Sequence, residues 1–132
     1  MAHVVEHVAL SNRRMAKTLS KRLLDSPLGE RVTDVVDAEI PFLFYRVEDA
    51  PELAPPSGTW IERDAALQTL ETSAQTILIW ASDTLASLRD VALAHPSFGL
   101  LDGIQWLLFA AAHMERHRAQ LIALRRHPDW PS

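Results

Sequence analysis

Apolar residues recur at three- and four-residue spacing in three long stretches of this 132-residue chain, and this periodicity constrains the fold more than any other feature. The spacing predicts helices at about residues 2–25, 60–94 and 102–126. The longest apolar seam lies in the middle stretch and consists of Leu67, Leu70, Ala74, Ile77, Leu78, Ala81, Leu85, Leu88 and Ala92. With no strand-rich alternation and no internal repeat, the sequence predicts an all-α protein with a single domain over residues 1–132.

A proline-rich connection separates the first two predicted helices at residues 26–58. Its prolines are Pro27, Pro41, Pro51, Pro55 and Pro56. We expect this connection to be ordered, with a short extended segment near Phe42–Val47, because long connections inside compact domains are more often functional than idle. Thr59 and Glu62 fit a capping box at the start of the second helix, and the turn that begins at His95-Pro96 ends that helix.

The composition excludes several classes of function. The chain has no cysteine, which rules out thiolate nucleophiles, cysteine-ligated metals and disulfides. Its 4 glycines are too widely spaced for a Walker loop or a dinucleotide-binding fingerprint. The formal net charge is −4, and the basic residues form no concentrated stretch, so we expect no nucleic-acid partner. The sequence carries no leader pattern or membrane-length apolar run, and it predicts a cytoplasmic protein with no membrane contact.

Two histidines one helical turn apart are the clearest candidates for chemistry. His113 and His117 project from the same face of the last predicted helix, with Cβ atoms about 5–6 Å apart. Two imidazoles at this spacing can bind one transition-metal ion, although the spacing is equally compatible with histidines that only form hydrogen bonds. Candidates for a third ligand are His3, His7, His95 and His127. Helical position alone leaves this choice open, because His7 lies at the margin of the apolar arc of the first helix.

Several segments together resemble the DinB-like superfamily. They are Val5-Glu6-His7-Val8-Ala9-Leu10, Ala50-Pro51-Glu52-Leu53-Ala54-Pro55-Pro56-Ser57-Gly58, His95-Pro96-Ser97-Phe98-Gly99-Leu100-Leu101-Asp102-Gly103, Gln105-Trp106-Leu107-Leu108-Phe109 and His113-Met114-Glu115-Arg116-His117-Arg118-Ala119-Gln120. The combination of an early Glu-His pair, a His-Pro-x-Phe-Gly turn and a late His-x-x-Arg-His-x-x-Gln helix is far more specific than any one of these motifs. The resemblance covers nearly the whole chain.

This resemblance implies a four-helix bundle with up-down-down-up connectivity, often dimeric, that holds a divalent metal with three histidines. Carried over by motif, His7 is the ligand from the early helix, and His113 and His117 are the pair from the last one. Zinc or nickel is the expected metal, with iron as a further candidate. Some members of the superfamily are S-transferases that use low-molecular-weight thiols such as bacillithiol or mycothiol. Arg116 and Gln120 match recurrent positions of the late motif and are expected to support the site or the packing.

The chain departs from the superfamily pattern at its start, because members usually have another helix before the Glu-His segment. A bundle that lacks this first helix would expose an apolar face, and we expect a homodimer to cover it. The predicted function is metal-dependent activation of a thiol or a water, for thiol S-transfer or hydrolysis of a small molecule, with Trp106 and Phe109 lining the substrate pocket. The alternative is a non-catalytic all-α dimeric interaction module. Glu6 and Glu115 are next to ligand positions in sequence, and we expect both to be solvated or capping charges.

Overall fold

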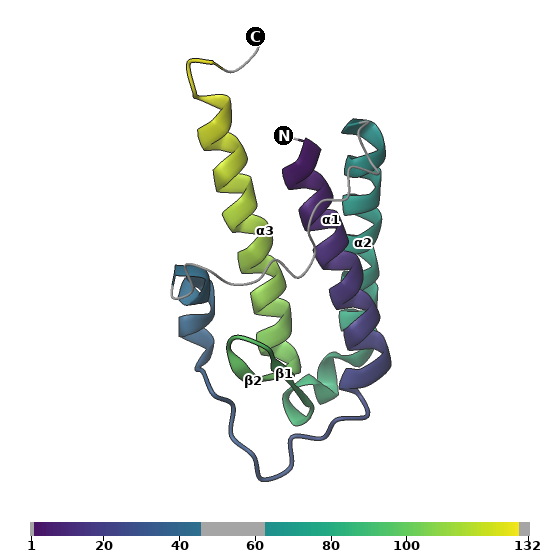
Figure 1. Ribbon diagram of the computed structural model, residues 1–132. Coiled ribbons are helices and arrows are strands. Elements are labelled where there is room, and N and C mark those ends of the chain that lie inside the picture. Colours follow the sequence, from purple (N-terminus) through teal and green to yellow (C-terminus); the bar gives the residue numbers. More distant parts are fainter. Residues whose placement is uncertain (1, 46–62, 130–132) are drawn as a thin grey trace.

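The computed structural model describes residues 2–45 and 63–129, and most of this part is helical. Helix α1 (Ala2–Thr18) continues into a short π-helix, η1 (Leu19–Leu23), and the other long helices are α2 (Arg63–Thr84) and α3 (Gly103–Arg125). Helices α1 and α2 run in the same direction and α3 runs in the opposite one (Figure 1). The helices predicted at residues 2–25 and 102–126 are confirmed.

The second predicted helix is wrong beyond Thr84. A 3-10 helix, η3 (Leu85–Asp90), follows α2, and residues Ala92–His95 form strand β1. This strand pairs antiparallel with β2 (Gly99–Asp102), so the all-α prediction holds for most of the described chain and fails at this hairpin.

Hydrogen bonds to distant residues explain why the helical pattern stops there. The Ala92 amide donates to the Ser26 carbonyl at 2.8 Å, and the Asp90 carbonyl accepts from the Leu28 amide at 2.8 Å. The Val91 carbonyl accepts from the Gly103 amide at 3.0 Å. These bonds replace those that a continued α2 would make, so tertiary contacts override the local periodicity.

The proline-rich connection at residues 26–58 also differs from the prediction of a short extended segment, in the part that the structure describes. Residues Asp37–Tyr45 form a 3-10 helix, η2, so an extended segment is wrong for Phe42–Tyr45. Ile40 and Leu43, three residues apart, are both fully buried, as the period of a 3-10 turn allows. Residues 46 and 47, the predicted capping box at Thr59 and Glu62, and the predicted helix start at residue 60 lie outside the described residues.

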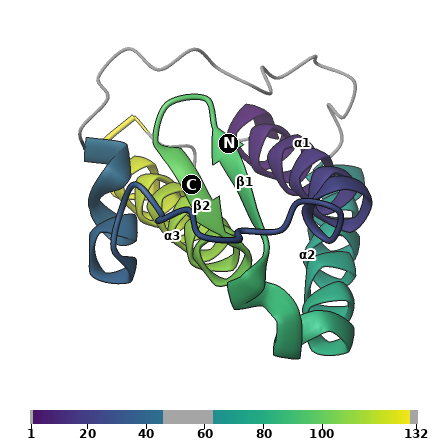
Figure 2. The same ribbon diagram turned by 90° about the horizontal axis from the view of Figure 1, so that it is seen from below.

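Helix α1 packs along α2 and also contacts α3, and η2 packs on the other side of α3 (Figures 1 and 2). The hydrophobic core lies toward the end of the molecule that carries the hairpin. Its largest fully buried apolar side chains are Leu19, Leu23, Ile40, Leu43, Leu88 and Leu101. At that end, Gly103 lies so close to η3 that a Cβ atom on it would be 2.6 Å from the Leu88 carbonyl oxygen.

A polar network fixes the start of α3. The Asp102 carboxylate accepts from the Gln105 amide at 2.8 Å, and the Gln105 side-chain oxygen accepts from the Asp102 amide at 3.1 Å, which is a reciprocal capping box. Gln105 also donates to the Val35 carbonyl at 2.8 Å. Arg89 bridges Asp102 and Asp37, and its hydrogen bond to Asp37 holds the pKa of that carboxyl below its ordinary value. The network therefore ties the connection, η3 and α3 together.

None of the described helices combines the length and the apolar character that crossing a bilayer requires.

Candidate metal centre

Three histidines from two helices converge where α1 passes α3. The Nε2 atom of His113 lies 3.3 Å from Nε2 of His7 and 3.1 Å from Nε2 of His117. One ring nitrogen from each of the three residues lies within 4.8 Å of the others. His113 and His117 are paired by helical spacing alone, whereas His7 arrives through the packing of α1 on α3. The predicted ligands are therefore assembled, close enough together to hold one metal ion.

The spacing of these nitrogens fits a first-row divalent ion. Imidazole nitrogens bind zinc at about 2.0–2.1 Å, and a tetrahedral angle between two such bonds places the nitrogens about 3.3–3.4 Å apart. The two Nε2 separations to His113, 3.3 and 3.1 Å, are close to this value. Three neutral protein ligands leave a fourth tetrahedral position for water or substrate, as catalytic sites do.

Burial keeps the central histidine in its metal-binding form. His113 is 9% exposed, and His7 and His117 are half-buried. Burial, together with the neighbouring His117 and His7, lowers the pKa of His113 to about 3. At neutral pH His113 is therefore an uncharged imidazole, the form in which histidine coordinates metals.

Gln120 orients one of the three ligands. Its side-chain oxygen lies 2.9 Å from Nδ1 of His117, one turn further along α3. Because an amide oxygen can only accept, this contact places the proton of His117 on Nδ1 and the lone pair on Nε2, which faces His113. This is the supporting role that the late motif predicts for Gln120.

A buried amide joins the two helices beside the triad. Asn12 of α1 is fully buried, and its Nδ2 donates to the Met114 sulfur of α3 at 3.4 Å. Its Oδ1 has no hydrogen-bond partner among the described residues. Met114 follows His113 directly, so this contact holds α1 against the segment of α3 that carries the ligands.

The predicted substrate-lining residues are in the core. Trp106 and Phe109 are 8% and 7% exposed, and the Trp106 indole nitrogen donates to the Leu93 carbonyl at 3.1 Å. The Phe109 ring is nearly parallel to that of His113, with centroids 6.4 Å apart. Phe109 thus lies behind the triad on its core side and Trp106 packs against Phe109, with ring centroids 5.9 Å apart. The role of both in substrate binding stays a prediction.

His95 is buried in the same aromatic cluster and is not part of the triad. Its ring stacks on Phe98 at 4.6 Å and contacts Phe109 at 4.9 Å, and its Nδ1 accepts from the Ser97 amide at 3.0 Å. Burial lowers its pKa to about 4. His127 is exposed beyond α3, 3.6 Å from the Asp129 carboxylate.

Of the two acids next to the ligands, one differs from the prediction. Glu115 is exposed and forms a 2.7 Å ion pair with Arg118, as a solvated charge does. Glu6 is only 1% exposed, so the prediction of a solvated or capping charge is wrong for it. Its burial has no signal in the sequence, because a polar residue beside a ligand position is ordinarily on the solvent side of a helix.

Comparison with protein-family models, curated proteins and solved structures finds no match for this chain. The DinB-like resemblance therefore rests on the sequence motifs, and the metal centre rests on the geometry of the three histidines.

Proposed function

We propose that this chain is a DinB-like, divalent-metal-binding protein that uses the metal to activate a thiol or a water against a small molecule. The observation that carries the proposal is the convergence of the Nε2 atoms of His7, His113 and His117, two of which lie 3.3 and 3.1 Å from the third. Zinc and nickel are the metals that this all-nitrogen ligand set favours, and iron is a further candidate.

The direction of the helices supports the family assignment. In an up-down-down-up bundle, the last three helices run down, down and up, with a long crossover between the two parallel ones. Helices α1, α2 and α3 have these relative directions, and the long connection lies between α1 and α2 (Figure 1).

The residues of the chain have separate tasks in this proposal. His7, His113 and His117 hold the ion without neutralising its charge, because all three ligands are uncharged. Gln120 keeps His117 in the tautomer that binds, through the 2.9 Å contact. Trp106 and Phe109 exclude water from the core side of the centre. A divalent ion held there lowers the pKa of a bound thiol or water, which favours the nucleophilic anion at neutral pH.

The test compares two reactions on one protein preparation. Zinc- and nickel-loaded protein is given cysteine with 1-chloro-2,4-dinitrobenzene, which reports thiol transfer, and p-nitrophenyl acetate, which reports hydrolysis. We expect a metal-dependent rate in one of the two assays, lost in His113→Ala and kept in His127→Ala, whose histidine is exposed and outside the triad. Metal-loaded protein that accelerates neither reaction above the His113→Ala background contradicts the catalytic proposal.

The alternative function, a non-catalytic dimeric module, has one observation in its favour. Leu78 and Ile79 on α2 are 65% and 64% exposed, and Leu67 on the same helix is also exposed. Large apolar side chains gathered on one helix are typical of surfaces that a partner covers. We therefore propose a homodimer through α2. Sedimentation velocity should show a wild-type dimer and a monomer for the double variant Leu78→Glu with Ile79→Glu. A wild-type protein that is monomeric at all accessible concentrations would contradict the proposed homodimer.

A further inference from the structure

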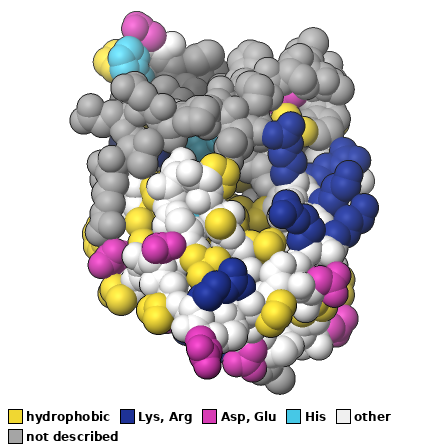
Figure 3. All heavy atoms as spheres, turned by 60° about the horizontal axis from the view of Figure 1, so that its bottom comes forward, with side chains coloured by type: hydrophobic (Ala, Val, Ile, Leu, Met, Phe, Trp, Pro, Cys, Tyr) yellow, Lys and Arg dark blue, Asp and Glu magenta, His cyan; other side chains and the backbone are white. Residues whose placement is uncertain are grey.

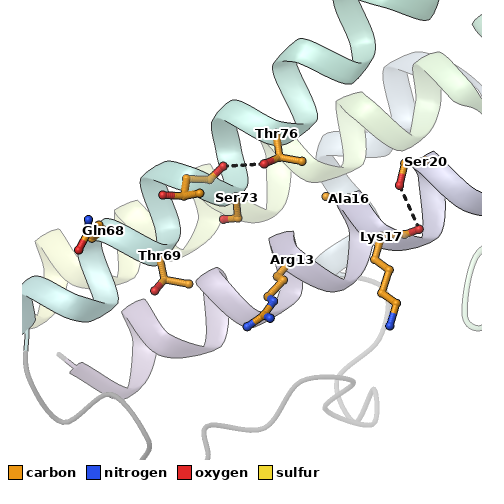
Figure 4. Close-up of a pocket in the computed structure, with 9 residues that line it drawn as sticks. Arg13, Ala16, Lys17, Ser20, Gln68, Thr69, Ser73 and Thr76 are labelled. Atoms are coloured by element: carbon orange, nitrogen blue, oxygen red, sulfur yellow. Dashed lines mark hydrogen bonds between the residues drawn. The ribbon is translucent and has the colours of Figure 1, made fainter.

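A groove lies between α1 and α2, on a part of the molecule that the metal centre does not use (Figure 4). Its volume is about 540 Å³, within the range of small-molecule sites. One wall carries Arg13 and Lys17 of α1 and Ser20 of η1, and the other carries Thr69, Thr72 and Thr76 of α2. Arg13 is turned about 120° around α1 from His7, and Lys17 lies about 15 Å further along the axis than His7, so the groove is separate from the triad.

The charge of the groove has one sign. Arg13 and Lys17 are exposed one turn apart, and none of the described residues that line the groove is acidic. Neither cation forms an ion pair with an acid in the part of the chain that the structure describes. Arg14, Lys21 and Arg22 extend the positive surface, and Figure 3 shows Lys and Arg side chains gathered on one side of the molecule. An anion in the groove would meet two cations and no competing carboxylate among the described residues of its walls.

Three of the hydroxyl groups in the groove, two on α2 and one on the opposite wall, already donate their protons within their own helices. Thr69 Oγ1 donates to the Ala65 carbonyl and Thr76 Oγ1 donates to the Thr72 carbonyl, both at 2.9 Å, and Ser20 Oγ donates to the Lys17 carbonyl at 3.3 Å. Each of these oxygens keeps lone pairs that can accept a further hydrogen bond. The groove thus offers cationic donors on α1 and neutral acceptors on α2 (Figure 4).

We propose that this groove binds a small molecule with an anionic group at one end and hydroxyl donors at the other, of the phosphorylated-sugar class. The anion pairs with Arg13 and Lys17, because a guanidinium and an ammonium one turn apart together match a phosphate dianion. The ligand hydroxyls donate to the threonine oxygens on α2. The proposal is independent of the metal and of the function proposed above.

The experiment is calorimetric titration of the full chain with glucose 6-phosphate and ribose 5-phosphate, with glucose and inorganic phosphate as partial probes. We expect saturable binding of a sugar phosphate, tighter than of either partial probe. Arg13→Gln with Lys17→Gln should weaken this binding about tenfold or more. Lys21→Gln with Arg22→Gln is the matched control: it removes the same charge outside the groove and should change affinity by less than about twofold.

A second pair of variants tests the hydroxyl wall. Thr72→Val with Thr76→Val keeps the side-chain shape and should weaken sugar-phosphate binding while leaving inorganic phosphate unchanged. Circular dichroism spectra and thermal midpoints show whether each variant is folded. Three outcomes overturn the proposal: no saturable binding of either sugar phosphate, equal weakening by the two charge-removing variants, or a single-stranded oligonucleotide that binds more tightly and displaces the sugar phosphate. The last result would identify a polyanion surface.

Discussion

The two halves of α3 differ in what surrounds them. The first half, from Gly103 to Ala110, is mostly buried and begins in the capping box of Asp102 and Gln105. The second half is mostly exposed, and His113 is the buried exception among its described side chains. Packing and capping thus concentrate at one end of the helix and metal-binding chemistry at the other. The two ligands on α3 therefore lie beyond the packed and capped end of that helix, and α1 brings His7 to them.

The largest expected effect is the loss of stability on creating a cavity in the core at the buried end of α3. Leu101 is fully buried in the core, so Leu101→Ala should lower the free energy of unfolding by about 2–5 kcal/mol in urea titrations. Zinc affinity of the folded variant should stay within about threefold of wild type, because the cavity lies in the hairpin. Weaker zinc binding by tenfold or more would show that the two ends are coupled.

The pH dependence of stability tests whether His95 is buried and neutral in its aromatic cluster with Phe98 and Phe109. The pKa of His95 is about 4 in the folded protein, below the ordinary value of 6.5. Between these two pH values, His95 is protonated in the unfolded chain and neutral in the folded one. The titration of His95 therefore leaves the free energy of unfolding unchanged above about pH 6.5. As the pH falls toward 4, it lowers that free energy by up to about 3 kcal/mol.

The control is His95→Phe, measured by urea unfolding from pH 7.5 to 4. The variant should lose less stability over this interval than wild type, and the difference isolates His95 because other titrating groups are common to both. Parallel curves for the two proteins would contradict a neutral, buried His95.

A pair of glutamines gives the sharpest contrast within α3. Gln105→Leu removes the half of the capping box in which the Asp102 amide donates to the Gln105 side chain, and it removes the hydrogen bond to the Val35 carbonyl. We expect it to lower the free energy of unfolding by about 1–3 kcal/mol, because buried partners lose their hydrogen bonds. Thermal and urea unfolding measure this cost, and a variant as stable as wild type would contradict the structural role of the network.

The other glutamine should behave in the opposite way. Gln120 is exposed and contacts His117, so Gln120→Leu should leave unfolding unchanged within about 0.5 kcal/mol. Its effect should appear in zinc affinity, weakened about 10- to 100-fold, as for other residues that orient a metal ligand. Competition titration with a chromophoric chelator measures this affinity. Restoration by Gln120→Glu, which keeps an acceptor for Nδ1, would support orientation of the ring as the cause.

The sequence predicts the long helices because their apolar periodicity agrees with their tertiary environment. It fails at Leu88 and Ala92, which continue the helical spacing of α2 but are buried in a 3-10 turn and a strand held by bonds to Ser26 and Leu28. Such contacts join segments that are distant in sequence, so local periodicity carries no trace of them.

The residues of the candidate site also differ in whether local sequence patterns predict them. The spacing of His113 and His117 on one helix predicts their pairing, while only the motif resemblance points to His7, because its place depends on α1 packing against α3. The burial of Glu6 and of His95 has no local signal, since both are polar residues buried by tertiary contacts. The sequence of this chain therefore predicts contacts between residues close together on one helix, and it does not predict packing between distant segments.

The most direct test of the metal centre is elemental analysis of protein stripped of metal, incubated with zinc and dialysed. We expect about one zinc per chain in wild type and in His127→Ala, and loss of zinc in each of His7→Ala, His113→Ala and His117→Ala. Loss in all three variants would show that ligands from both helices act on one ion. Folded wild-type protein that retains no zinc or nickel, or a His7→Ala variant that retains its full metal content, would contradict a metal centre formed by the three histidines.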